Sequence, residues 1–156
     1  MTLVSQLAAL LAVLSTGIVY GTDAFCALVQ RSALARVDDS TLTAVMGNLH
    51  RVADRRMPVP GILGVIAAAA AAVLAALAGR PAAAATAGAA FVLLVVWVLL
   101  YLRVSAPINR RLTVAADAHE TPADVRGWQR AWDRIIVPRA VLQGLAVLAL
   151  GVSLIS

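Results

Sequence analysis

At 156 residues the chain has the length of one domain, but 62% of its residues are hydrophobic and only 13% are charged, about half the charged share of a soluble protein. This composition excludes a soluble enzyme and a disordered chain. It also excludes a nucleic-acid-binding protein, so we interpret the net charge of +5 as a sign of membrane topology. One cysteine, Cys26, excludes an internal disulfide, and the two histidines, His50 and His119, cannot by themselves complete a metal site. The sequence therefore predicts an integral membrane protein.

Four apolar segments are long enough to cross a bilayer, which takes about 20 residues. We expect one integral membrane domain over residues 1–156, with spans at about 3–28, 61–79, 81–102 and 135–155. The second and third spans are uncharged, and the fourth carries Arg139. No basic residue precedes the first span, so we expect it to remain as a helix and not to act as a signal peptide.

The connectors between the spans predict the topology. Twelve of the 13 arginines lie on or near the two long connectors, residues 29–60 and 103–134, whereas Arg80 alone lies in the short turn between the second and third spans. By the positive-inside rule, the connectors face the cytoplasm and both termini lie outside the inner cell membrane.

Both long connectors are expected to be helical. In the first, Asp38-Asp39-Ser40 is a good N-terminal cap for an amphipathic helix that ends before Pro58. In the second, Thr121-Pro122-Ala123-Asp124 predicts the start of a long final helix, from about 122 to 155, which Pro138 should bend. The predicted fold is all-α, a four-transmembrane-helix bundle with two amphipathic cytoplasmic connector helices.

Polar residues of the first span share one face at 100° per residue. They are Ser5, Thr16, Tyr20, Asp23 and Gln30. A polar face toward lipid is costly, so we expect this face to point into the bundle, with Gly17 and Gly21 beside it in close contact with a neighbouring helix. Thr16 and Tyr20 could serve only to join helices, whereas a membrane carboxylate such as Asp23 favours a functional role.

The last helix aligns Trp128, Trp132, Arg139 and Gln143 on one face. Tryptophans near an interface can be plain anchors, but this alignment also fits an inward, pocket-lining role. A buried guanidinium must be paired, and Asp23 enters from the same side, so we expect the two to face each other. The alternative is that Arg139 extends to the headgroups.

His50 lies four residues before Asp54, a spacing at which the carboxylate could orient the imidazole. The alternative is an ordinary surface histidine. His119 is expected in a loop beside Glu120, without a catalytic role. No metal-ligand set, phosphate-binding loop or nucleotide fingerprint is present in the sequence, and we expect no cofactor.

The order of these features resembles the anthrone oxygenase-like family of small four-helix membrane proteins, known as a domain of unknown function. The resemblance covers nearly the whole chain and includes the Gly17–Gly21 region, Ala44-Val45-Met46-Gly47-Asn48-Leu49-His50-Arg51 and Ala106-Pro107-Ile108-Asn109, followed by Trp128, Trp132 and Arg139. It implies the oxidation of anthrones to anthraquinones in polyketide biosynthesis, without metal or flavin.

For such a flat, apolar substrate, we interpret His50 or Asp23 as the base and Arg139 with Asn109 as the groups that stabilise the oxyanion. Tyr20, Trp128, Trp132 and Gln143 are the further candidates for substrate contacts. The alternative function is non-enzymatic, as a carrier for a small amphipathic molecule or an accessory subunit. The expected partners are the lipid bilayer and the substrate, and the sequence leaves open a homo-oligomer.

Overall fold

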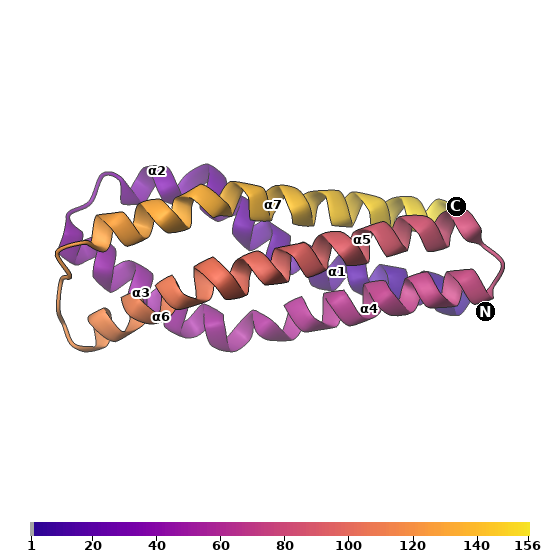
Figure 1. The fold of residues 1–156 in the computed structure, drawn as a ribbon, viewed down its shortest axis with the longest axis horizontal. Coiled ribbons are helices and arrows are strands. Elements are labelled where there is room, and N and C mark those ends of the chain that lie inside the picture. The colour runs from indigo at the N-terminus through magenta and orange to yellow at the C-terminus, as the bar shows by residue number, and fades with distance from the viewer. Residues whose placement is uncertain (1) are drawn as a thin grey trace. The chain divides into compact units, whose positions relative to one another are not determined.

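The computed structural model describes residues 2–156, and over this range it contains helices and no strand. The helices are α1 (Thr2–Phe25), α2 (Arg31–Leu34), α3 (Asp39–Arg56), α4 (Pro58–Leu77), α5 (Pro81–Leu100), α6 (Ala106–Asp117) and α7 (Val125–Ile155) (Figure 1). Four helical stretches are long and apolar enough to cross a membrane: Thr2–Leu34, Pro58–Leu77, Pro81–Asp117 and Val125–Ile155. The all-α class and the four candidate spans are therefore confirmed. The predicted domain also includes Met1, which lies outside the described residues.

The caps of α3 follow the prediction, and the start of α7 does not. Asp38 is the N-terminal cap of α3, where its Oδ1 accepts from the Thr41 backbone N–H at 2.7 Å, a contact that lowers the pKa of the Asp38 carboxyl. The predicted start of the last helix at 122 is wrong by three residues. The Val125 N–H bonds to the Pro122 carbonyl, so the predicted cap forms a separate turn before α7.

Two π-helical turns, here called the first π-turn (Cys26–Gln30) and the second π-turn (Tyr101–Ser105), interrupt the α-helical geometry. The first joins α1 to α2, and the second joins α5 to α6. Each is closed by a backbone hydrogen bond between residues five apart in the sequence. The Arg31 N–H donates to the Cys26 carbonyl, and the Ala106 N–H donates to the Tyr101 carbonyl. Such turns are rare and frequently occur at functional sites.

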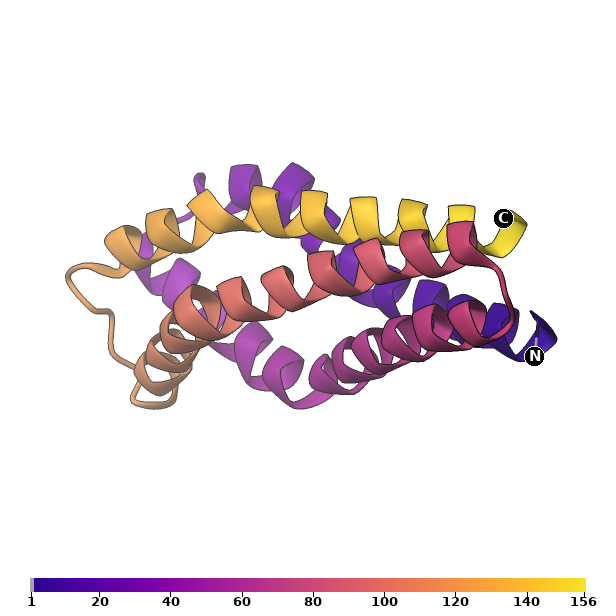
Figure 2. The ribbon, with the colours of Figure 1, turned by 45° about the vertical axis from the view of Figure 1, so that its right-hand side comes forward.

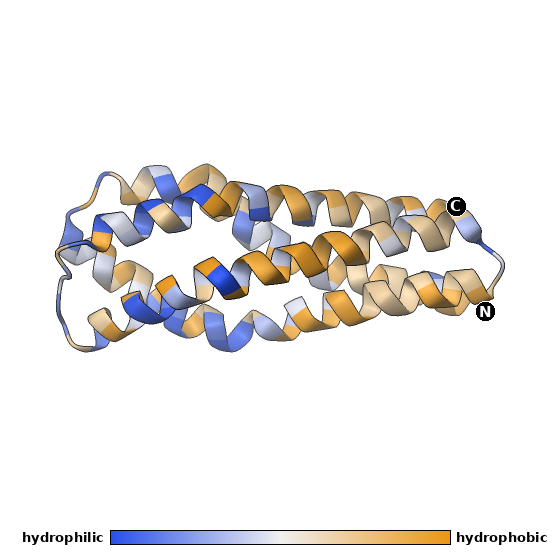
Figure 3. Ribbon diagram, viewed as in Figure 1, coloured by the Kyte–Doolittle hydropathy of each residue, from blue (hydrophilic) through white to orange (hydrophobic). Residues whose placement is uncertain are grey.

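The chain divides into two compact units. The apolar unit comprises the chain up to Gly21 with Val59–Val98 and Val141–Ser156, and the polar unit comprises Thr22–Pro58 and Leu99–Ala140. Colouring by hydropathy separates the mostly orange helices of the apolar unit from the blue-rich α3, α6 and early α7 (Figure 3).

Small side chains form the core of the apolar unit. Its parts of α1, α4, α5 and α7 run alongside one another in both ribbon views (Figures 1 and 2). The buried cluster holds Ala12, Ala67, Ala68, Ala90, Leu94, Ala146 and Leu150. A Cβ on Gly64 would lie 2.7 Å from the Thr16 hydroxyl, so α4 and α1 approach closely there. By contrast, a Cβ on Gly17 or Gly21 would meet no atom of residues 2–156 within 4 Å. The predicted close contact of this pair with a neighbouring helix is therefore wrong.

The short turn of the apolar unit is built around Arg80. Gly79 has a φ of 69°, a left-handed conformation that glycine adopts without strain. The Arg80 guanidinium donates to the Ser5 hydroxyl and to the Ser153 and Ser156 carbonyls, at 3.3, 3.4 and 3.1 Å. Within this unit the two ends of the chain therefore meet at the turn.

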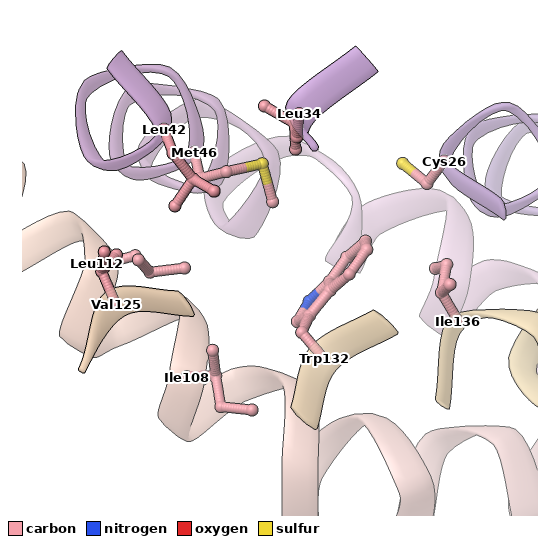
Figure 4. Packing of buried hydrophobic residues seen from close by; sticks show 9 residues of the cluster. All are labelled: Cys26, Leu34, Leu42, Met46, Ile108, Leu112, Val125, Trp132 and Ile136. Carbon is pink, nitrogen blue, oxygen red and sulfur yellow. The ribbon is translucent and has the colours of Figure 1, made fainter. Parts of the chain in front are cut away.

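Larger side chains fill the polar unit. Its buried cluster, drawn in Figure 4, holds Cys26, Leu34, Leu42, Met46, Ile108, Leu112, Val125, Trp132 and Ile136. Helix α3 packs along α6, and a Cβ on Gly47 would collide with Ala116 and the Leu112 carbonyl. Ion pairs between Arg51 and Asp117 and between Arg126 and Asp39 add exposed links within this unit.

Candidate functional site

A buried ion pair lies within the polar unit. Arg139 of α7 donates from Nη2 to Oδ1 of Asp23 in α1 at 2.9 Å, and only 6% and 4% of these residues are exposed. The expectation that the two face each other is confirmed, and extension of Arg139 to the headgroups is contradicted by its burial. Either charge alone would be costly in a buried setting, so the two side chains depend on each other as a pair.

The second π-turn holds the other side of the Arg139 guanidinium. Arg139 Nη1 donates to the Ser105 hydroxyl at 2.6 Å. The guanidinium carbon also lies 5.5 Å from the centroid of the Tyr101 ring, within range of a cation–π interaction. Side chains from α1, α7 and the second π-turn thus fix the position of one cation.

A chain of hydrogen bonds continues from Tyr101. Its hydroxyl donates to Oδ1 of Asp54 at 3.0 Å, and the Asn109 amide donates to the same oxygen at 3.0 Å. The indole N–H of Trp132 in turn donates to Oδ1 of Asn109 at 3.0 Å. We call the seven residues Asp23, Asp54, Tyr101, Ser105, Asn109, Trp132 and Arg139 the polar network. It connects α1, α3, α6, α7 and the second π-turn within one unit.

His50 lies against this network. Its side chain is buried, with 3% of the residue exposed, and its ring centroid is 5.6 Å from that of Trp132. The pKa of His50 is lowered from 6.5 to about 4, chiefly because the side chain is buried; the charge of Asp54 opposes this change and that of Arg139 adds to it. The imidazole is therefore neutral at pH 7. Its Nε2 is buried and has no hydrogen-bond partner among residues 2–156.

The two expectations about His50 are both corrected. It is not a surface histidine, because α3 turns it into the core of the polar unit. Nor does Asp54 orient it through a hydrogen bond within residues 2–156, because Asp54 accepts from Tyr101 and Asn109 instead. The i, i+4 spacing is present, but donors on another segment occupy the carboxylate.

The remaining predicted residues fall in both units. Gln143 is fully buried, and Tyr20 is 36% exposed and lies against Gly144, both in the apolar unit. Trp128 is partly buried in the polar unit, and the Arg111 guanidinium lies 5.7 Å from its ring. The inward face predicted for α1 holds for Ser5, Thr16, Asp23 and Gln30, which are all buried, and Tyr20 is the exception.

Tyr101 and Ser105 were not among the predicted site residues. A signal for them exists in the sequence, since Tyr101, Ser105 and Asn109 are spaced four residues apart at the end of an apolar segment. Gln30 is a further polar member of the unit, and its amide donates to the Met46 sulfur at 3.2 Å.

Among residues 2–156, no group of three or more histidine, cysteine or acidic side chains is placed to hold a metal ion. No family model matches the chain, and neither the curated proteins nor the solved structures include a significant match. The polar network and His50 are therefore interpreted from their own geometry.

Proposed function

We propose that this chain oxidises a flat, apolar, anthrone-like or phenolic substrate to a quinone with O₂, without metal or flavin. The observation that carries this proposal is the buried, neutral imidazole of His50 with its unpartnered Nε2, next to a network that holds the Arg139 guanidinium. A neutral imidazole with an open nitrogen can accept a proton, and a fixed cation can stabilise the resulting anion.

His50 is the base we favour, because Asp23 is engaged by Arg139. The low pKa of His50 fits a base that is unprotonated before substrate binds. Once it has taken a proton, the imidazolium lies beside a substrate anion, and an opposite charge at short range stabilises it. In this proposal Arg139 and Asn109 stabilise the oxyanion, with their donors shifting from Ser105 and Asp54 to the substrate, and the Trp132 indole contacts its flat ring.

The chemistry balances without a further reductant. His50 removes one proton from the central methylene of an anthrone, and the carbanion transfers one electron to O₂. The carbon radical and superoxide combine to a peroxide anion, which takes back the proton from His50. The second C–H bond then breaks as the O–O bond breaks, so that one water leaves and the methylene carbon becomes the second carbonyl of the quinone.

The test is O₂ consumption and quinone formation by the purified protein in detergent with anthrone as substrate. His50→Ala should lower turnover by about 10² to 10⁴-fold, the usual contribution of a general base. His119→Ala is the matched control and should be nearly silent, because His119 is exposed in the turn after α6. Equal turnover of the two folded variants would remove His50 from the mechanism.

A second candidate is a non-enzymatic role, as a carrier or an accessory subunit. It is favoured by the sharing of one Asp54 oxygen between Tyr101 and Asn109, a pattern that also serves to join helices. Folded wild-type protein that consumes no O₂ with any anthrone or phenol tested, yet copurifies with a membrane complex, would favour this role over oxidation.

For the topology we propose that the chain lies in the inner cell membrane with α3 and α6 as amphipathic connector helices in the cytoplasm and both termini outside. Support comes from the arginine distribution, with Arg80 alone at the opposite turn. A reporter fused after Ser156 should be active only outside the cytoplasm. A C-terminal fusion active only in the cytoplasm would overturn this topology.

A further inference from the structure

An open depression lies on the surface of the polar unit, apart from the polar network. Its volume is about 510 Å³, and it is lined by Leu102, Ala106, Pro107, Arg110, Arg111 and Val114. The lining combines two guanidinium groups with apolar side chains and contains no acidic residue. Such a combination matches a ligand that is anionic at one end and apolar at the other.

The two arginines of the depression keep their donors available. Arg110 and Arg111 make no hydrogen bond and no ion pair with residues 2–156, unlike Arg51, Arg126 and Arg139. The Trp128 ring holds the Arg111 guanidinium at 5.7 Å without using its N–H groups. A guanidinium presents its N–H groups in a planar fork that binds phosphate oxygens in pairs.

The length of the candidate span places the depression near the change from hydrocarbon to headgroups. The candidate span Pro81–Asp117 is 37 residues long, whereas the hydrocarbon core takes only about 20 helical residues. Counted from Pro81, the hydrocarbon ends close to Leu102, and Arg110 and Arg111 follow on the headgroup side. Basic pockets at this level bind anionic lipid headgroups.

We propose that this depression binds the headgroup of an anionic phospholipid. Arg110 and Arg111 bind its phosphate, and Leu102, Ala106 and Val114 contact its glycerol and upper acyl chains. The site is independent of the oxidation proposed above, since it uses none of the polar network.

The test is native mass spectrometry of the detergent-purified chain with phosphatidylglycerol or phosphatidylethanolamine of the same acyl chains. Phosphatidylglycerol should be retained in preference, and Arg110→Gln with Arg111→Gln should reduce its retention by about tenfold, because charge-assisted bonds to phosphate are lost. The matched control is Arg55→Gln with Arg56→Gln, an equally charged and exposed pair at the end of α3, which should leave retention unchanged.

Three results would overturn the proposal. Unchanged retention in the Arg110 and Arg111 variant would remove the depression as the site, and equal loss in the Arg55 and Arg56 variant would mean attraction by total charge alone. Displacement of the lipid by inorganic phosphate at equal concentration would assign the site to a free anion. The thermal stability of each variant, measured in the same detergent, ensures that folded protein is compared.

Discussion

The apolar and polar units hold their helices together in different ways. Arg80 is the one charged side chain in the apolar unit, and all other charged side chains belong to the polar unit. The apolar core consists largely of alanine, so its helices adhere by close backbone approach. The polar unit instead buries hydrogen-bonded and charged groups, which are costly in a membrane unless each has a partner. One unit should thus be sensitive to added volume, and the other to lost charge.

The largest expected effect is in the polar unit. Asp23→Asn should lower the free energy of unfolding by about 3 to 5 kcal/mol, because it leaves the Arg139 charge buried without its carboxylate. Denaturant unfolding in detergent micelles measures this loss. The double substitution with Arg139→Gln should cost less than the two single substitutions added together.

Arg130→Gln is the control for this pair, because Arg130 is exposed on the same helix, and its effect should stay within about 0.5 kcal/mol. Additive costs in the double variant would contradict a direct coupling between Asp23 and Arg139.

A smaller effect concerns pH and the neutral state of His50. Its pKa of about 4 in the folded chain lies below the ordinary 6.5, so the unfolded chain takes up this proton first as the pH falls. Stability should be full above pH 6.5, fall between pH 6.5 and 4 by about 3 kcal/mol, and change no further from this source below pH 4.

Unfolding curves measured across this pH range for two variants isolate the contribution of His50. His50→Ala should flatten the fall, whereas His119→Ala should keep it. If both variants kept the same fall, the pH dependence would belong to other groups.

The smallest effect on stability should occur in the apolar unit, where it depends on the space available for an added side chain. Gly64→Ala places a Cβ at 2.7 Å from the Thr16 hydroxyl and 3.3 Å from its backbone nitrogen, at a cost of about 1 to 3 kcal/mol. Gly88→Ala has open space around its Cβ and should stabilise α5 by about 0.5 to 1 kcal/mol. Melting temperatures in detergent should therefore move in opposite directions, and equal shifts would contradict the packing difference.

The sequence predicted the features that depend on the spacing of residues within one helix. Asp23 and Arg139 could be paired in advance because each is a charge on an inward face of an apolar helix, and such charges need a partner. The N-terminal cap at Asp38 followed from local chemistry, since a carboxylate reaches a backbone N–H three residues on.

Contacts between segments could not be predicted in the same way. Asp54 was expected to serve His50 on its own helix, but the competing donors Tyr101 and Asn109 come from a segment some 50 residues away in the sequence, which spacing cannot place. The exposed position of Tyr20 depends on the rotation of the whole helix α1 against its neighbours. That rotation is a property of packing, which a wheel drawn for one helix does not contain.

The two π-turns limit where residues can be deleted from the chain. A π-turn contains one residue more than an α-helical turn. Because each helical residue turns the chain by about 100°, that extra residue determines which way the side chains after the π-turn face relative to those before it. Deleting one residue between Cys26 and Gln30 would leave a continuous α-helix, but Asp23 and Gln30 would no longer face Arg139 and Met46 at the same time. Substitutions at exposed positions of the first π-turn, such as Leu28, should therefore be tolerated far better than a single-residue deletion.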